Sequence, residues 1–537
     1  MDKDGITGFA GFAGGPAALR GTRGFWQEAE TIIPTNSSSS TLVRRNTLWN
    51  IFGLGFPLAL VFLFIPRLIS GLGTERWGAL TLILTFLNYF GLFDLGIGRA
   101  LTRLLASQPR EDKKEEAVLI WTVSAALGIL GVVGALILFL LAPFLASKLV
   151  RATGSLNGEV VMALRELALT LPFLIHSLAL RGILEAKRRF DLSNLIRIPV
   201  VIFTFGVPLL VVPFSQDLGV IVAIILAGRI LAWLLNLGMV FRILPHLKRM
   251  QGWKPNDIWG LARYGGWMTV SGVAGPILDG MDRFFVSTLL SISMVAFYTT
   301  PYELIVKLGI ISGGIGGAVF PEFAFRLHRN PAEARSLFMR GLKYLLAIFF
   351  PFVLVATVYA EEGLSWWLNP QFAALSAPVL QWLALFVLLG GAATMTCGFL
   401  QAAGRPELSA TMHLLELPVH AGLLFVFIKL YGISGAAIAG ILRVLIDFLG
   451  TLFFSGSILG FNARTYGRIL FPIGAAVATL LAFHLPMPPV LKTVAFWSVL
   501  AGYIYVTWSL ILDSKDKAAI LKVSPNFPRF FSRGRNE

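Results

Sequence analysis

The sequence predicts an all-α, polytopic membrane protein with about fourteen transmembrane helices. Of its 537 residues, 56% are hydrophobic and only 14% are charged. The mean hydropathy is +0.75, far above that of a soluble protein of this length. Hydrophobic runs of roughly 18 to 28 residues, the length that a bilayer requires, recur along the chain between short polar breaks. Together these observations indicate a chain that crosses a membrane many times.

Each hydrophobic run is taken as one predicted span. The spans of the first half are residues 46–70, 77–105, 117–146, 161–185, 195–213 and 218–243. Those of the second half are residues 258–290, 295–324, 341–360, 376–402, 408–430, 433–459, 467–485 and 489–512. The predicted domains are a disordered cytoplasmic tail, a first lobe, a second lobe, two C-terminal helices and a second cytoplasmic tail, at 1–45, 46–250, 251–460, 461–512 and 513–537.

The formal net charge is +16, from 45 basic and 29 acidic residues, and the basic residues gather in alternate loops. Such an asymmetry orients membrane proteins with the basic loops in the cytoplasm, so both termini are predicted to face that side. We therefore expect no nucleic-acid partner despite the basic charge. Cys397 is the only cysteine, which excludes an intrachain disulfide, a Cys-based zinc site and a Cys-x-x-Cys redox motif.

An internal duplication divides the first twelve spans into two units. RGILEAKRRFDLS at 181–193 aligns with CGFLQAAGRPELS at 397–409. GVIVAIILAGR from Gly219 aligns with GISGAAIAGILR from Gly432 at nearly the same offset. Six is an even number, so equivalent helices of the two units run in the same direction. Several secondary transporters have this arrangement, and we therefore expect two six-helix lobes around a central cavity, plus two C-terminal helices.

The stretch IPRLISGLGTERWGALTLILTFLNYFGLFDLGIGRALTR resembles the first two spans of bacterial flippases for lipid-linked O-antigen and exopolysaccharide repeat units. DRFFVSTLLSISMVAFYTTPYEL, GGIGGAVFPEF, QFAALSAPVLQWLALF, GFLQAAGRPELS and YGISGAAIA are similar to later landmarks of that family, in the same order. The chain departs from the family in its long N-terminal tail, in Ala296 where glycine is expected, and in Arg188 where the second repeat has Gly404.

The resemblance implies a member of the multidrug, oligosaccharidyl-lipid and polysaccharide exporter superfamily. Its expected function is to move an undecaprenyl-diphosphate-linked oligosaccharide from the cytoplasmic to the outer leaflet of the bacterial inner membrane, for surface polysaccharide synthesis. The expected partners are this lipid-linked glycan, membrane lipids and the polysaccharide polymerase machinery. We expect a monomer without a cofactor and without enzymatic activity.

Two alternatives on the same fold stay open, namely a multidrug or cation antiporter and a lipid II flippase. A scaffold protein is a further possibility, which charges buried in both halves disfavour. A membrane glycosyltransferase or polymerase would need a sizeable extramembrane loop with acid and base residues, whereas no predicted outer loop exceeds about sixteen residues.

Basic residues inside the spans are the candidates for binding a diphosphate. An ionisable group at the helix centre costs at least about 2.5 kcal/mol, so it faces a cavity or a partner. Arginine and lysine form charge-assisted hydrogen bonds with phosphate. The candidates are Arg99, Arg229, Arg283, Lys307 and Arg443. Arg229 has no acidic residue one turn away, which indicates either an anion site or a pair with Asp94 or Asp447 on another helix.

Acidic residues inside the spans, with one histidine, are the candidates for the cavity wall and for ion coupling. They are Asp94, Asp279, Asp282, Glu303, His413, Glu416 and Asp447. Three pairs have the i,i+4 spacing of an ion pair on one helix, so a purely structural role is the alternative for them. These pairs are Asp279 with Arg283, Glu303 with Lys307, and Arg443 with Asp447.

A polar stripe follows one face of the eleventh span. Ser409, His413, Glu416 and His420 fall close together on the helical wheel. A metal site is the least favoured interpretation because the spacing lacks a known ligand signature, and we expect no metal. A proton relay and interhelical hydrogen bonding both stay open.

Overall fold

The computed structural model describes residues 37–90, 101–102, 105, 113–187, 189–248, 252 and 256–511. These residues form helices and their connections, without a strand. Ten segments among them are long and apolar enough to cross a membrane. The predicted fold class of an all-α, multi-pass membrane protein is therefore confirmed, while the count of fourteen spans stays a prediction.

The first half of the chain contains nine α- and π-helices and a short 3-10 helix in the described residues. They are α2 Ser37–Phe90, α4 Lys113–Phe144, η3 Leu145–Val150, α5 Ser155–Ala186, α6 Phe190–Leu195, α7 Arg197–Val201, η4 Ile202–Gly206, α8 Val207–Val211, α9 Leu218–Ile243 and η5 Pro245–Lys248. The predicted span at 195–213 is thus a series of short helical segments. Asp94 and Arg99 lie outside the described residues.

The second half begins with α10 and ends with a pair of outlying helices. Its elements are α10 Asn256–Leu289, α11 Ile292–Ile305, η6 Val306–Leu308, α12 Gly309–Arg329, α13 Pro331–Val358, α14 Ala360–Trp367, α15 Pro370–Ala402, α16 Pro406–Leu459, α17 Ala463–Ala482, α18 Pro489–Val506 and η7 Thr507–Ile511. Each predicted span of this half therefore has a helical counterpart close to its expected limits.

Two long helices each contain a glycine kink at a boundary between predicted spans. Gly73 in α2 has φ 75° and Gly432 in α16 has φ 59°. Glycine has no Cβ, so it adopts this left-handed region without the steric cost that other residues meet. The two kinks lie between 46–70 and 77–105 and between 408–430 and 433–459, where the sequence predicts a change of direction.

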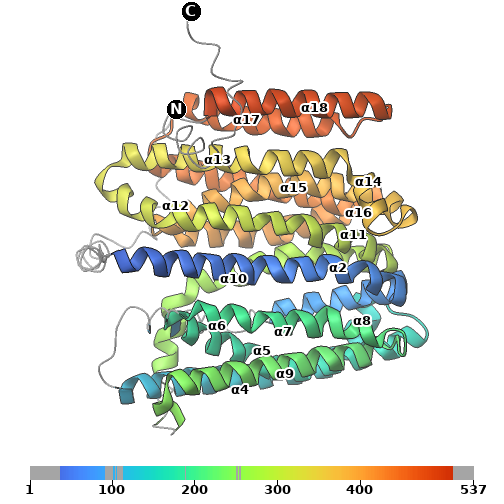
Figure 1. The fold of residues 1–537 in the computed structure, drawn as a ribbon, viewed down its shortest axis with the longest axis vertical. Coiled ribbons are helices and arrows are strands. Elements are labelled where there is room, and N and C mark those ends of the chain that lie inside the picture. The colour runs from blue at the N-terminus through green and yellow to red at the C-terminus, as the bar shows by residue number, and fades with distance from the viewer. Residues whose placement is uncertain are drawn as a thin grey trace, which may run out of the picture.

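The two halves of the chain lie side by side (Figure 1). α4, α5, α9 and the segments α6 to α8 form one side, α11 to α16 form the other, and α17 with α18 lies at the outer edge of the second side. α2 packs against α10 and α11 where the halves meet. The indole N–H of Trp77 in α2 donates to Thr300 Oγ1 in α11 at 3.0 Å. This buried hydrogen bond ties the two halves together.

The predicted duplication has a structural counterpart in the turns that follow α5 and α15. The amide of Arg189 donates to the carbonyl of Leu184 at 2.8 Å, and the amide of Arg405 donates to the carbonyl of Leu400 at 2.9 Å. Each arginine also pairs with the carboxylate two residues further along the chain. The same turn therefore occurs at equivalent places in both repeats.

Candidate functional site

Two adjoining cavities contain most of the predicted basic residues that the structure describes. One has a volume of about 530 Å³ and lies among α5, α7, η4 and α9 of the first half. The other has a volume of about 220 Å³ and lies between the halves, against α2, η4, α9, α10 and α11. Arg229 and Lys307 line both cavities. We call the combined space the cationic cavity, because five cations and one carboxylate, Glu303, stand on its wall. The cations are Arg181, Arg197, Arg229, Arg283 and Lys307.

Arg229 reaches this cavity from the middle of α9. Its side chain is half-buried, its Nε has no hydrogen-bond partner, and it forms no ion pair among the described residues. The alternative pair with Asp447 is therefore wrong, because Asp447 lines a different cavity in the second half. The other alternative partner, Asp94, lies outside the described residues. Among the described residues, the guanidinium of Arg229 thus lies at the cavity without an acidic partner.

Arg283 and Lys307 share one carboxylate. Arg283 Nη2 lies 2.9 Å from Glu303 Oε1, and Lys307 Nζ lies 3.0 Å from Glu303 Oε2. Arg283 Nη1 also donates to Thr85 Oγ1 across the boundary between the halves, at 2.7 Å. The predicted pair of Glu303 with Lys307 is confirmed, whereas the alternative pair of Asp279 with Arg283 is wrong because Arg283 turns toward Glu303. Two cations on one carboxylate leave a net positive charge at this wall.

Asp282 is buried beside the cavity and does not line it. Its carboxylate accepts a hydrogen bond from the hydroxyl of Tyr298 and another from the backbone amide of Arg283, at 2.8 Å. Its side chain is fully engaged in packing between α10 and α11. This geometry does not support the prediction of Asp282 as a cavity residue. The sequence of α10 alone could not show that this side chain would pack against α11.

Sequence reasoning missed two arginines of the cationic cavity. Arg181 near the end of α5 and Arg197 at the start of α7 both line it. Both arginines lie near the ends of predicted spans, where a charged side chain is expected to reach water. Arg197, like Arg229, has no acidic residue one turn away on its own helix. This absence of a local partner is the sequence signal that could have identified Arg197. Arg181 pairs with Glu185 on its own helix at 2.9 Å.

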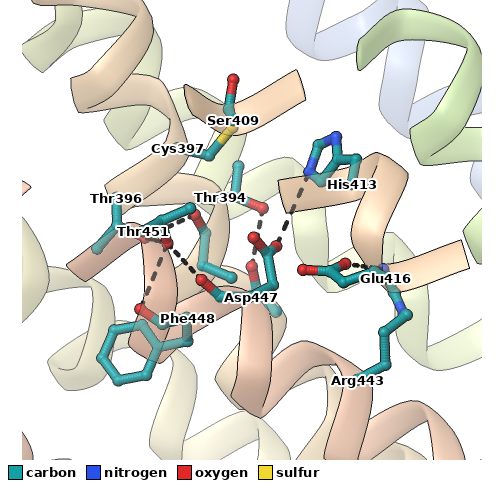
Figure 2. A network of polar contacts seen from close by, with 12 residues as sticks. Thr394, Thr396, Cys397, Ser409, His413, Glu416, Arg443, Asp447, Phe448 and Thr451 are labelled. Carbon is teal, nitrogen blue, oxygen red and sulfur yellow. Dashed lines mark hydrogen bonds and ion pairs between the residues drawn. The ribbon is translucent and has the colours of Figure 1, made fainter. Parts of the chain in front are cut away.

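A second cavity, of about 480 Å³, lies among α10, α11, α12, α15 and α16. Asp279, His413, Arg443 and Asp447 stand at its wall, and the buried Glu416 lies beside Arg443. We call these five residues the acidic cluster. Arg443 Nη2 lies 3.0 Å from Asp279 Oδ1, and Arg443 Nη1 lies 3.8 Å from Glu416 Oε2. His413 Nε2 lies 4.0 Å from Asp447 Oδ2. Figure 2 shows His413, Glu416 and Asp447 pointing toward one another beside Arg443.

The acidic cluster corrects the ion-pair partner expected for Arg443, while substrate binding by Arg443 stays a prediction. The sequence suggested a substrate-binding cation or an i,i+4 pair with Asp447. Arg443 instead pairs with Asp279 and Glu416, so its charge is compensated and it lies apart from the cationic cavity. Helix α10 supplies Asp279 across from α16, which is why the spacing along α16 alone predicted the wrong partner.

The polar stripe of α16 faces the interior of the second half. Ser409, Glu416 and His420 are 0%, 2% and 2% exposed, and His413 lines the cavity. Among the described residues, no group of three His, Cys, Asp or Glu side chains is placed to hold a metal ion. The stripe is therefore an internal polar surface, suited to hydrogen bonding or to proton transfer.

With this geometry in place, comparison with known proteins identifies the family. Residues 66–377, more than half of the chain, match the family described as polysaccharide biosynthesis protein. The chain belongs to this family. A putative O-antigen transporter of Shigella flexneri is 28% identical over 405 residues, which cover 75% of this chain and 96% of that protein. The predicted resemblance to polysaccharide flippases is confirmed.

Solved structures of the superfamily share the fold of this family member. Lipid II flippase MurJ in an inward closed conformation has a TM-score of 0.63 and 14% identity, over 87% of this chain and 99% of that chain. An inward-facing multidrug resistance MATE family transporter has a TM-score of 0.62 and 18% identity, over 78% and 96%. A transporter of the MOP superfamily from Pyrococcus furiosus has a TM-score of 0.55 and 15% identity, over 79% and 99%.

Proposed function

We propose that this protein is a flippase that moves an undecaprenyl-diphosphate-linked oligosaccharide repeat unit from the cytoplasmic to the outer leaflet of the inner membrane. Family membership and the similarity to a putative O-antigen transporter support a role in surface polysaccharide synthesis. The similarity to lipid II flippase MurJ and to MATE transporters supports a fold with a cavity between two lobes.

The observation that carries this proposal is the lining of the larger part of the cationic cavity. Arg181, Arg197, Arg229 and Lys307 line it, and no carboxylate is among its lining residues in the part of the chain that the structure describes. A diphosphate loses hydration on entry and requires donors that stay charged, which arginine provides. A cationic drug would require carboxylates instead, so the antiporter alternative is disfavoured. A lipid II flippase stays open because its substrate also carries a diphosphate.

The acidic cluster has a different part in the proposed mechanism. It lies in the second half, among helices equivalent to those that form the cationic cavity, yet it contains three carboxylates and a histidine. We assign it to ion coupling, with His413 and Glu416 accepting and releasing a proton during the transport cycle. Histidine suits this role because its charge changes near physiological pH.

The proposal also includes the orientation of the termini, the oligomeric state, the partners and the domain limits. Both termini lie in the cytoplasm, the protein acts as a monomer, and its product passes to the polysaccharide polymerase machinery. The tail, lobe and C-terminal limits at 45, 250, 460 and 512 stay as predicted from the sequence. The protein carries out no covalent chemistry on the glycan. An assay for repeat unit accumulating on the cytoplasmic leaflet of a deletion strain tests this reaction directly.

Substitution of Arg229 tests the cationic cavity. One charge-assisted hydrogen bond contributes about 1.5–3 kcal/mol, so Arg229→Ala should lower flipping by about tenfold to a hundredfold. Arg229→Lys should retain part of the activity, and Arg229→Glu should abolish it. The measurement is surface polysaccharide at matched protein level in a strain that depends on this protein.

Arg165 on α5 offers a matched control for Arg229. It is a half-buried arginine of the same half, it contacts the ring of Phe139 at 5.0 Å, and it does not line the cationic cavity. Arg165→Ala should therefore leave flipping nearly unchanged. Full activity in Arg229→Ala would remove Arg229 from the substrate site. Rescue of Arg229→Glu by Asp94→Arg would instead show a structural ion pair.

A further inference from the structure

A cleft at the outer edge of the second half lies apart from both cavities described above. It has a volume of about 1220 Å³ and lies between α13 and α17, next to the end of α18. Figure 1 shows α17 and α18 at this edge, with α13 between them and the rest of the second half. The cleft is lined by residues within 332–346 of α13 and 464–473 of α17, and by Val506.

The walls of the cleft divide into an apolar part and a basic part. The apolar residues are Ala332, Met339, Leu342, Leu346, Ile469, Phe471, Pro472, Ile473 and Val506. The basic residues are Arg335, Lys343, Arg464 and Arg468, and no carboxylate of the described residues lines the cleft. An apolar wall beside a group of cations matches an amphiphile with an anionic headgroup.

Three of these cations have no partner among the described residues. Lys343, Arg464 and Arg468 are exposed and form no ion pair or hydrogen bond there. Arg335, in contrast, donates to Thr465 Oγ1 and lies over the ring of Phe461 at 5.4 Å. Arg335 therefore stabilises the start of α17, while the other three are available to a ligand.

The α17–α18 pair beside the cleft buries few residues against the rest of the protein. Phe496 is the only buried residue of α18, and Phe471 of α17 is 79% exposed. Tyr503 of α18 donates to the carbonyl of Leu346 at 2.8 Å, which attaches the pair to α13. Inside a bilayer, a space with apolar walls is filled more favourably by lipid acyl chains than by water. A lipid in the cleft would thus fill the gap between α13 and the α17–α18 pair.

We infer that this cleft binds an anionic phospholipid of the surrounding bilayer, with its phosphate at Lys343, Arg464 and Arg468 and an acyl chain along the apolar wall. Basic pockets between transmembrane helices at the cytoplasmic side are recognised binding places for anionic headgroups. The C-terminal segment 512–537 is a poor competitor because it carries more basic than acidic side chains, so its charge opposes that of the cleft.

Charge removal is the first test of this lipid site. The purified full chain is equilibrated with phosphatidylglycerol or phosphatidylcholine in detergent, and lipid retention is measured by native mass spectrometry. Arg464→Gln/Arg468→Gln should retain at least about tenfold less phosphatidylglycerol, since each lost charge–phosphate bond weakens binding. Phosphatidylcholine, which has no net charge, should bind weakly to every form.

A matched pair of surface cations controls for general charge effects. Arg242 ends α9 and Lys248 ends η5, both are exposed, and neither lines the cleft. Arg242→Gln/Lys248→Gln should retain phosphatidylglycerol like the unaltered protein. An equal loss in both double variants would overturn the proposal, and so would equal retention of the two lipids by the unaltered protein.

A steric block tests the cleft itself without changing charge. Gly467 lines the cleft, and a Cβ added there has no atom within 4 Å, so Gly467→Leu places its side chain in open space. Gly474 of the same helix is equally unobstructed and does not line the cleft. Gly467→Leu should lose phosphatidylglycerol and Gly474→Leu should retain it. Undiminished binding in Gly467→Leu would overturn the site, and displacement of phosphatidylglycerol by equimolar undecaprenyl diphosphate would assign the cleft to the substrate's lipid instead.

Discussion

Arg229 and Arg443 show how neighbours decide what a buried arginine does. Both lie within apolar helices, in equivalent segments of the two repeats. Arg443 has Asp279 at 3.0 Å and Glu416 at 3.8 Å, so its charge is compensated within the protein. Arg229 has no ion-pair partner among the described residues and lines a cavity. The first arginine therefore belongs to a charged cluster, and the second is the one that we propose for binding a phosphate.

A prediction at the residue scale concerns His413. Its Nε2 lies 4.0 Å from Asp447 Oδ2, with Glu416 and Arg443 in the same cluster. If proton uptake by this cluster drives transport, the flipping rate should depend on pH. His413→Gln keeps a hydrogen-bonding side chain but cannot be charged, so the pH dependence of its flipping rate should be flatter.

The measurement for His413 is flipping in proteoliposomes at several pH values. Thr394→Ser, which alters a hydroxyl residue of the same cavity without adding or removing a titratable group, is the control and should keep the original pH profile. A folded, membrane-inserted His413→Gln protein with an unchanged profile would leave His413 only a structural role.

At the scale of elements, the contact of α2 with α11 holds the two halves together. Gly78 of α2 lies directly against the backbone of Ile292, and a Cβ at this position would overlap the Ile292 carbonyl oxygen. Trp77 and Thr300 form their buried hydrogen bond next to this contact. A transporter that opens alternately to the two sides must separate such a contact in one of its states.

A substitution at Gly78 should disturb this contact. Overpacking costs about 1–3 kcal/mol, and because the clash is with backbone, Gly78→Val should push α2 and α11 apart. A cysteine at Ala296, which is 0% exposed, should then become reactive toward a maleimide in a Cys397→Ser background. Flipping should fall as well.

Gly128 in α4 provides the matched control, because a Cβ there has no atom within 4 Å. Gly128→Val should change neither the labelling of Ala296→Cys nor the flipping rate. Slow labelling of Ala296→Cys in the Gly78→Val protein, at the level of the parent, would show that α2 and α11 tolerate the added side chain without separating.

At the scale of the whole molecule, the orientation in the bilayer follows from the distribution of basic residues among the loops. Asn369, the N-cap of α15, belongs to a loop with few basic residues, and Gln108 belongs to one flanked by Arg110 and Lys113. A cysteine at Asn369 should therefore react with a membrane-impermeant maleimide from the periplasm. A cysteine at Gln108 should react only after permeabilisation, and the reverse pattern would invert the topology.

Much of the architecture could be predicted from the chain because membrane spans are specified locally. A run of apolar residues long enough for a bilayer must be helical, since its backbone groups find no water to bond. Loop charges and the duplicated segments at 181–193 and 397–409 are equally local signals. The structure confirms the duplication in the paired turns at Arg189 and Arg405.

The sequence by itself thus determined the all-α membrane class, the approximate spans and the presence of ionisable residues within them, because each depends on consecutive residues or on helical spacing. Only the tertiary structure decided which partner each charge finds. Arg283 turns to Glu303, Arg443 turns to Asp279, and Arg197 joins Arg229 at one cavity. Coulomb energy depends on distance in space, and residues from different helices approach one another only when the helices pack.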